Sequence, residues 1–341
     1  MNYAETSLGP VVGSMLPAIG RPSSFTLNTM IEVKIFSGTN SRYLSEKIAD
    51  YYGQPLGDVT INRFSDGEMQ PVINESVRGA FVFFVQSTFA PAENLMELLL
   101  MVDAAKRASA GYITVAIPYF GYARQDRKDK PRVPISAKLI AELLQAAGVD
   151  RVMTMDLHAD QIQGFFDIPV DHLKSEAIYI PYLQEQDIEN VIFASPDVGG
   201  VKRARNYAEY FGKNLVICDK YRKKANEIAE MTVIGEVAGF DVILVDDLVD
   251  TAGTLCRAVD ILLKQGARSV RAFCTHPVLS GKAIENIEKS GLQELVVCDT
   301  IPIPPSKKSK KIKILSTAKL FARAIRNTHE HRSISALFIE G

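Results

Sequence analysis

Two adjacent aspartates and the short polar run that follows them are the residues of this sequence that most directly suggest chemistry. The aspartates are Asp246 and Asp247, and the run consists of Asp250, Thr251, Ala252, Gly253 and Thr254. Glycine allows a ligand to approach the backbone closely, and threonine hydroxyls donate hydrogen bonds to phosphate oxygens. Carboxylates would repel the phosphate itself, so they fit sugar hydroxyls or a metal ion. The pattern therefore predicts a site for a sugar phosphate.

The residues on either side of this stretch predict the elements that position it. Residues 242–245 are apolar and mostly β-branched, which is typical of a strand buried on both faces. Apolar residues then recur at helical spacing at Leu255, Val259 and Leu262, until Gly266 ends the run. A strand, a small-residue turn and a helix direct backbone N–H groups and a helix dipole at a phosphate. A plain turn with solvated aspartates is the alternative that the local pattern leaves open.

A second polar strand end suggests a metal site. Asp156 and His158 follow the predicted strand 152–155, and residues two apart in an extended segment point to the same side. Asp197 follows another predicted strand, 190–194, just before a glycine turn. A lone histidine is more often a core or surface residue, and an isolated Asp-x-His is a weak signal. The neighbouring acids and the strand-end position nevertheless favour a divalent metal ion.

Two charged segments have the composition to contact phosphates. The first, residues 119–134, places aromatic rings beside arginines and contains Arg124, Gln125 and Asp126. Aromatic rings stack on a base, and arginines neutralise phosphates. The second is a basic run, 219–227, which we interpret as a mobile lid. In each case a solvated loop is the simpler alternative.

Composition places the chain among ordinary globular proteins. Its 341 residues suit two domains, and 47% apolar with 23% charged residues allow a sizeable core. The net charge of −1 gives no support for binding to nucleic acid or to an anionic membrane. No apolar run has the length of a membrane span. The four cysteines lie far apart without metal-ligand spacing, which favours free thiols in a reducing compartment and predicts a cytoplasmic protein.

Predicted strands and helices alternate along the chain. This order is typical of an α/β fold in which a mostly parallel sheet is covered by helices on both faces. The strand-end motifs at Asp156 and Asp246 resemble each other, as do residues 113–121 and 191–199. We therefore expect an internal duplication into two similar domains, with chance similarity of such units as the alternative.

The first domain is predicted at residues 30–173 and the second at 174–341. Residues 1–29 are rich in Pro, Gly, Ser and Thr and contain one basic residue, which predicts a disordered tail or a translation start placed too far upstream. In the first domain we expect a strand at 59–64 and a helix at 136–147. Near the other end we expect a helix at 318–328, followed by an edge strand or tail at 331–338.

From residue 31 to residue 338 the sequence resembles the ribose-phosphate pyrophosphokinases, in their phosphate-activated class. The stretch around Asp246 resembles the phosphoribosyl-binding motif of the type I phosphoribosyltransferase fold, and further motifs make the resemblance specific. These motifs lie at 64–68, 122–126, 155–159, 163–171, 195–197 and 220–223. The resemblance implies two phosphoribosyltransferase-like domains. It also implies transfer of the diphosphoryl group of ATP to the C1 hydroxyl of ribose 5-phosphate, which yields phosphoribosyl diphosphate and AMP.

The resemblance further implies roles for individual residues. The catalytic residues, which would close over the reacting phosphates, are Lys220 and Arg222. ATP would be bound by Phe64, Asp66, Gly67, Glu68, Arg124, Gln125 and Asp126. Mg²⁺ would be bound by His158 and Asp197, with Asp156 as support or as a contact to metal-bound water. Ribose 5-phosphate would be bound by Arg222, Asp246, Asp247, Asp250, Thr251, Ala252, Gly253 and Thr254.

Assembly and regulation are also implied by the resemblance. Members of this class form homo-hexamers that are activated by inorganic phosphate and inhibited by ADP at an anion site between subunits. The positions that match this regulatory site are Ser76, Arg78, Gln163, Ser333 and Ser335. The sequence departs from the pattern at Asp160, where some relatives have serine. A carboxylate there would repel phosphate or ADP, which puts the strength of the regulation in question.

Three other functions are compatible with parts of the sequence. A phosphoribosyltransferase shares the motif at Asp246 but needs one such domain, and it leaves His158 and Asp197 unexplained. A non-catalytic subunit that regulates such a synthase would share the fold but lack residues of the catalytic loop, whereas Lys220 and Arg222 are both present. A generic nucleotide-binding module would not need the complete sugar-phosphate motif.

Overall fold

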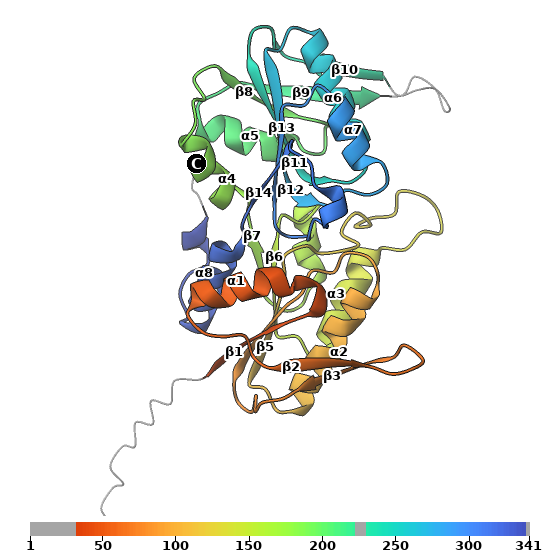
Figure 1. Cartoon of the computed structure of the whole chain (residues 1–341), viewed down its shortest axis with the longest axis vertical. Helices are drawn as coiled ribbons and strands as arrows, with labels where there is room; N and C mark the ends of the chain where they lie inside the picture. The colour runs from red at the N-terminus through yellow and green to blue at the C-terminus, as the bar shows by residue number, and fades with distance from the viewer. Residues whose placement is uncertain (1–31, 222–229, 339–341) are drawn as a thin grey trace, which may run out of the picture. The chain divides into compact units, whose positions relative to one another are not determined.

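Two mostly parallel β-sheets organise the chain in the computed structural model, which describes residues 32–221 and 230–338 (Figure 1). The first sheet has the order β1 (Val33–Ser37), β4 (Phe81–Val85), β5 (Tyr112–Ile117), β6 (Arg151–Met155) and β7 (Val170–Leu173). The second has the order β10 (Glu230–Ile234), β9 (Leu215–Tyr221), β8 (Val191–Ser195), β11 (Asp241–Val249), β12 (Ser269–Pro277), β13 (Glu294–Cys298) and β14 (Ile312–Leu315). Among the described strands of these two sheets, β10 alone runs antiparallel to its neighbour. The predicted α/β class with mostly parallel sheets is confirmed.

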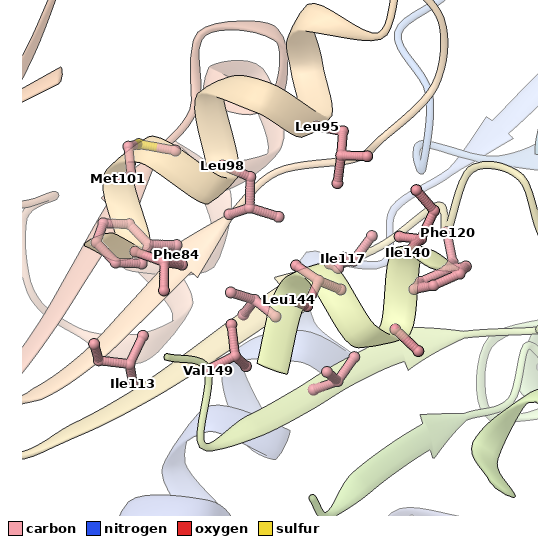
Figure 2. Close-up of a cluster of buried hydrophobic side chains, with 14 of the residues drawn as sticks. Phe84, Leu95, Leu98, Met101, Ile113, Ile117, Phe120, Ile140, Leu144 and Val149 are labelled. Carbon is pink, nitrogen blue, oxygen red and sulfur yellow. The ribbon is translucent and has the colours of Figure 1, made fainter. Parts of the chain in front are cut away.

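The strands of both sheets are apolar along most of their length because helices cover both faces. On one face of the first sheet lie α2 (Glu93–Arg107) and α3 (Ser136–Ala147). Figure 2 shows Leu98 and Met101 of α2 and Leu144 of α3 in one buried cluster with Phe84 of β4. On the corresponding face of the second sheet lie α6 (Gly253–Lys264) and α7 (Ala283–Lys289).

The opposite faces are covered by an exchange of helices between the two halves of the chain. The last helix, α8 (Ala318–His329), packs beside α1 (Arg42–Tyr52) on the first sheet, where Phe321 is fully buried. Conversely, α4 (Glu176–Gln184) follows the first sheet in the chain but packs on the second, together with α5 (Val201–Tyr210). The predicted domain boundaries stay predictions, and residues 1–29 lie outside the described residues.

The two sheets repeat one connectivity. Strands β1-β4-β5-β6-β7 and β8-β11-β12-β13-β14 have the same parallel order, with α1 and α5, α2 and α6, and α3 and α7 at matching places in the chain. The expected duplication is therefore present, but the predicted pairing of Asp156 with Asp246 was wrong. By strand order, Asp156 after β6 corresponds to Asp299 after β13. The error arose because buried parallel strands that end in aspartate look alike in sequence, and only the sheet order distinguishes them.

Two short segments differ from their sequence-based descriptions. The strand expected at 59–64 forms β2 (Val59–Arg63), which pairs with β3 (Met69–Ile73) in a separate two-stranded sheet against α2. Residues 331–338 contain a short 3-10 helix, Ser335–Leu337, and no strand, because Leu337 is buried on the first sheet with α8. Of the helices in the described ranges, none combines the length and apolar character that crossing a membrane requires.

The exchange of helices predicts a stability effect at Phe321. Replacing this fully buried ring by alanine leaves a cavity between α8 and the first sheet, so Phe321→Ala should cost about 3–5 kcal/mol in the free energy of unfolding by urea. Tyr51→Ala in α1, where the ring is 57% exposed, serves as the control and should change it by less than about 0.5 kcal/mol. Equal costs for the two variants would contradict the described packing of α8.

Candidate active site

Asp246 and Asp247 lie in β11, just past the point where the neighbouring strand β8 stops pairing with it. The predicted strand 242–245 continues as β11 to Val249, because β12 pairs with it as far as Val249↔Pro277. On its other side β8 stops at Leu244↔Ala194. Asp246 and Asp247 therefore lie inside the strand but beyond the end of β8, at the open carboxyl edge where α/β sheets bind ligands.

The predicted phosphate loop and the acidic pair line one cavity of about 330 Å³. The loop leads into α6, and Ala252 adopts a left-handed backbone (φ 60°) just before the helix begins. The lining residues that the sequence predicted are Arg124, His158, Asp197, Asp246, Asp247, Asp250, Thr251, Ala252, Gly253 and Thr254. Arg124 and Asp250, which are 126 residues apart in the chain, are hydrogen-bonded here. The two halves of the chain thus form one cavity, and its lining has the composition of a sugar-phosphate site.

His158 and Asp247 connect the two halves inside this cavity. His158 Nδ1 donates a hydrogen bond to Asp247 Oδ2 at 2.7 Å, which raises the pKa of the imidazole above its ordinary 6.5. Burial alone would raise the pKa of Asp247, but the hydrogen bond from His158 and the charge of Arg203 outweigh burial, so it lies below its ordinary value. The carboxylate thereby holds the ring in one orientation and leaves Nε2 as its free nitrogen.

Asp197 is the second predicted metal ligand, and it lines the same cavity as His158. Gly200 N donates to Asp197 Oδ1 at 2.9 Å, which fixes the turn after β8. One carboxylate and one imidazole nitrogen do not make an all-protein site, and the described part of the chain holds no cluster of three or more His, Cys, Asp or Glu suited to a metal ion. The pair fits an ion such as Mg²⁺ that takes further ligands from phosphate oxygens and water.

Asp156, the third residue of the predicted metal set, is 4% exposed. Its two carboxylate oxygens accept hydrogen bonds from Ser175 N, at 3.3 Å, and from Thr275 Oγ1. Burial would raise the pKa of Asp156, but the charges of Arg203 and Lys174 and these hydrogen bonds hold it below its ordinary value. The role of Asp156 toward a metal ion, as support or as a contact to metal-bound water, stays a prediction.

Arg203 of α5 is a site residue that the sequence analysis missed. Its side chain is 18% exposed, and Nη1 lies 3.5 Å from both Asp246 Oδ1 and Asp247 Oδ1. Burial and the charge of Asp247 raise the pKa of Asp246, and Arg203 opposes this shift. The signal available in the sequence was a basic residue in the first turn of the helix that follows Gly199-Gly200. The sequence does not show that this residue faces the acidic pair, because that depends on the order of strands in the sheet.

Comparisons with known proteins agree with this geometry. Residues 33–148 match the family profile of the N-terminal domain of ribose phosphate pyrophosphokinase, and residues 213–339 match that of the phosphoribosyl synthetase-associated domain. The chain is 56% identical over 313 residues to a ribose-phosphate pyrophosphokinase of Porphyromonas gingivalis, covering 92% of this chain and 99% of the relative. It is 56% identical over 307 residues to one of Wolinella succinogenes, covering 90% and 99%.

A crystal structure of phosphoribosylpyrophosphate synthetase from Mycobacterium smegmatis is similar, with a TM-score of 0.82 at 39% identity over 88% of this chain and 99% of that one. The chain belongs to the ribose-phosphate pyrophosphokinase family. The resemblance found in the sequence is thereby confirmed, together with the enzyme class and the two phosphoribosyltransferase-like domains that it implied.

The predicted ATP-binding residues of this pyrophosphokinase-family chain fall into two groups. Arg124 Nη1 forms an ion pair with Asp250 Oδ2 at 2.8 Å, so it meets the phosphate loop directly. Asp126 Oδ2 accepts a hydrogen bond from Gln161 at 2.9 Å in a neighbouring cavity of about 480 Å³, and Gln125 accepts one from Ser136. The other group, Phe64, Asp66, Gly67 and Glu68, lies at the tip of the β2–β3 hairpin and lines neither cavity.

The two predicted catalytic residues, Lys220 and Arg222, lie where the described range 32–221 ends. Lys220 belongs to β9, but its side chain lies outside the described residues, as does the whole of Arg222. Their proposed contact with reacting phosphates therefore stays a prediction.

The predicted regulatory residues lie on three segments of the family fold. Ser76 and Arg78 precede β4, and Arg78 Nη1 donates to Ser109 Oγ at 3.2 Å. Ser333 precedes the final 3-10 helix and Ser335 begins it, and their hydroxyls are 2.6 Å apart. Gln163 lies in the 3-10 helix Asp160–Phe165 after β6. All of these side chains are exposed or half-buried, and the regulatory site stays a prediction.

Asp160 is paired with basic side chains. Its carboxylate forms ion pairs with Lys174 at 2.7 Å and Lys202 at 2.9 Å. Burial would raise the pKa of Asp160, but hydrogen bonds from the two lysines outweigh burial and hold it well below its ordinary value. Because two ammonium groups balance the carboxylate, the repulsion of anions expected from the sequence is largely offset.

The ion pair between His158 and Asp247 predicts a pH-dependent contribution to stability. Because the folded state raises the pKa of His158, the contribution is fully present below about 6.5, the unfolded pKa, and is lost as the pH rises through the folded value. In metal-free buffer, the stability lost on His158→Gln should therefore be larger at pH 6 than at pH 9. The pH dependence should disappear in an Asp247→Asn background, and a larger loss at pH 9 would contradict the assignment.

Proposed function

We propose that the chain transfers the diphosphoryl group of ATP to the C1 hydroxyl of ribose 5-phosphate. The C1 oxygen bonds to the β-phosphorus, the bond between that phosphorus and the α,β-bridging oxygen breaks, and AMP leaves as the hydroxyl proton is released. The observation that carries this proposal is the single cavity in which the acidic pair, the phosphate loop, His158 and Asp197 meet.

Ribose 5-phosphate is assigned to the β11 side of the cavity. Loop residues 250–254 and the N-terminus of α6 offer backbone N–H groups and threonine hydroxyls to the 5-phosphate. Asp246 and Asp247 offer carboxylate oxygens to the ribose hydroxyls. Arg203 supports this assignment because its positive charge offsets the repulsion between the half-buried Asp246 and the buried Asp247.

The triphosphate of ATP is assigned to the side formed by Arg124, His158 and Asp197. Mg²⁺ bound at His158 and Asp197 would neutralise charge on the transferring group and polarise it. Arg124, anchored on Asp250, adds a cation at the junction between the two substrates. Lys220 and Arg222 complete the proposal as a lid that stabilises the transition state and excludes water.

The exposed β2–β3 tip supports a homo-oligomer, proposed as a hexamer. Phe64 is 51% exposed and lines neither cavity of its own chain. If these tip residues bind adenine, a second copy must bring them to the phosphates. Inorganic phosphate and ADP are the proposed effectors, at Ser76, Arg78, Gln163, Ser333 and Ser335. The cytoplasm is the proposed compartment, supported by four free and buried cysteines.

Phosphorus NMR tests the reaction. Purified protein with ATP, ribose 5-phosphate, Mg²⁺ and inorganic phosphate should produce AMP together with a sugar-linked diphosphate. Lys220→Ala should slow the conversion about a hundredfold or more, because it removes a cation from the transition state. Unchanged ATP in the presence of folded protein would favour a regulatory subunit, and release of free diphosphate from phosphoribosyl diphosphate with an added base would favour a phosphoribosyltransferase.

A kinetic comparison tests the regulatory assignment. Arg78→Ala removes a cation from the predicted anion site at the start of β4 but leaves the cavity residues intact. The variant should keep its rate at low phosphate and lose most of the activation that phosphate gives the unaltered chain. Lys106→Ala, a change of the same charge on α2, should respond to phosphate normally. A normal response of Arg78→Ala would exclude this residue from the site.

A further inference from the structure

The segment that carries His158 begins with a strained residue. Asp156 has a positive φ of 36° although it is not glycine. Such a backbone persists only where the surroundings hold it firmly, and it concentrates at functional sites. His158 follows two residues later, so the conformation at Asp156 decides where the imidazole enters the cavity.

Two residues of β12 hold Asp156 from the second half of the chain. Thr275 Oγ1 donates to the Asp156 carboxylate, and His276 Nε2 donates to the Asp156 carbonyl oxygen at 3.2 Å. Because a carbonyl only accepts, the proton of neutral His276 is on Nε2, and Nδ1 accepts from Thr300 Oγ1 at 2.9 Å. We call the hydrogen bonds from Thr275 and His276 to Asp156 the β12 clasp.

The first half of the chain holds the same segment from the other side. Asp156 N donates to Leu173 O at 3.0 Å, and Leu157 N donates to His172 Nε2 at 2.8 Å. The backbone before His158 is thus fixed by β7 on one side and by the β12 clasp on the other. Thr275 lines none of the cavities described and reaches the site through Asp156. His276 reaches it through Asp156 and also lines a small space of about 10 Å³ with Arg124, His158 and Asp247.

We propose that Thr275 and His276 are positioning residues for His158. The β12 clasp keeps Asp156 in its strained conformation, so that the imidazole meets Asp247 and the reacting phosphates in one orientation. The consequence for catalysis rests on the proposed function, whereas the effect on the backbone of this segment does not. A misplacement of such a group by about 1 Å reduces turnover by up to about a hundredfold.

The test replaces one hydroxyl and uses a matched control. Thr275→Val removes the donor with little change in shape, and Thr275→Ser restores it. Thr114→Val makes the same substitution at another fully buried threonine, on β5, whose hydroxyl has no hydrogen-bond partner. The two measurements are steady-state kinetics and hydrogen exchange of the peptide that spans residues 155–160, the latter in ligand-free and metal-free protein.

Thr275→Val should lower kcat at least about tenfold while KM for ribose 5-phosphate changes less than about twofold. It should also speed amide exchange in 155–160, and both Thr275→Ser and Thr114→Val should behave like the unaltered chain. An unchanged kcat or an unchanged exchange rate in Thr275→Val overturns the proposal.

A second variant, His276→Phe, tests the same proposal if Thr275→Val does not fold. His276→Phe keeps a ring against Tyr119, 5.0 Å away between centroids, but removes the Nε2–H donor, and it carries the same expectations. If the unaltered chain makes no phosphoribosyl diphosphate, the proposed function fails. The exchange measurement then still decides whether the β12 clasp holds the segment, because it needs no substrate.

Discussion

Two buried carboxylates hold the halves of this chain together. Asp156, at the end of β6, accepts a hydrogen bond from Ser175 N just before α4. Asp299, at the matching end of β13, accepts one from Thr317 N just before α8, at 2.7 Å. Since α4 then covers the second sheet and α8 the first, each carboxylate marks the point where the chain passes to the opposite half. The cavity between the sheets depends on this exchange, because it fixes the strand ends that form its walls.

Charge balance is the second constraint on the cavity. Asp246 and Asp247 are adjacent, and the Asp247 side chain is 7% exposed, a combination that costs free energy unless cations lie nearby. Arg203 provides one cation at 3.5 Å from both, and His158 provides a hydrogen-bond donor at 2.7 Å. The same contacts that lower this cost also orient the groups proposed to meet the substrates. Stability and chemistry therefore rest on the same few side chains at the carboxyl edges of β6 and β11.

Local pattern determined most of the elements and the identity of the phosphate loop. The helix at Ser136–Ala147 begins and ends as predicted, because apolar spacing and a following glycine define it without tertiary help. The sugar-phosphate stretch was recognisable because few other functions require a buried strand to be followed by two carboxylates and then by small and hydroxyl-bearing residues. Family membership followed from several such motifs together.

Tertiary structure alone decided which strand ends meet and which helix covers which sheet. The sequence paired Asp156 with Asp246, but strand order pairs it with Asp299, because strands buried on both faces carry no mark of their neighbours. The sequence alone does not distinguish Arg203 from an exposed residue on a helix surface. The packing of α5 on the second sheet places it beside the acidic pair. The β12 clasp joins residues 119 and 120 positions apart. Contacts of that range depend on the packing of whole elements, which short-range patterns in a sequence do not encode.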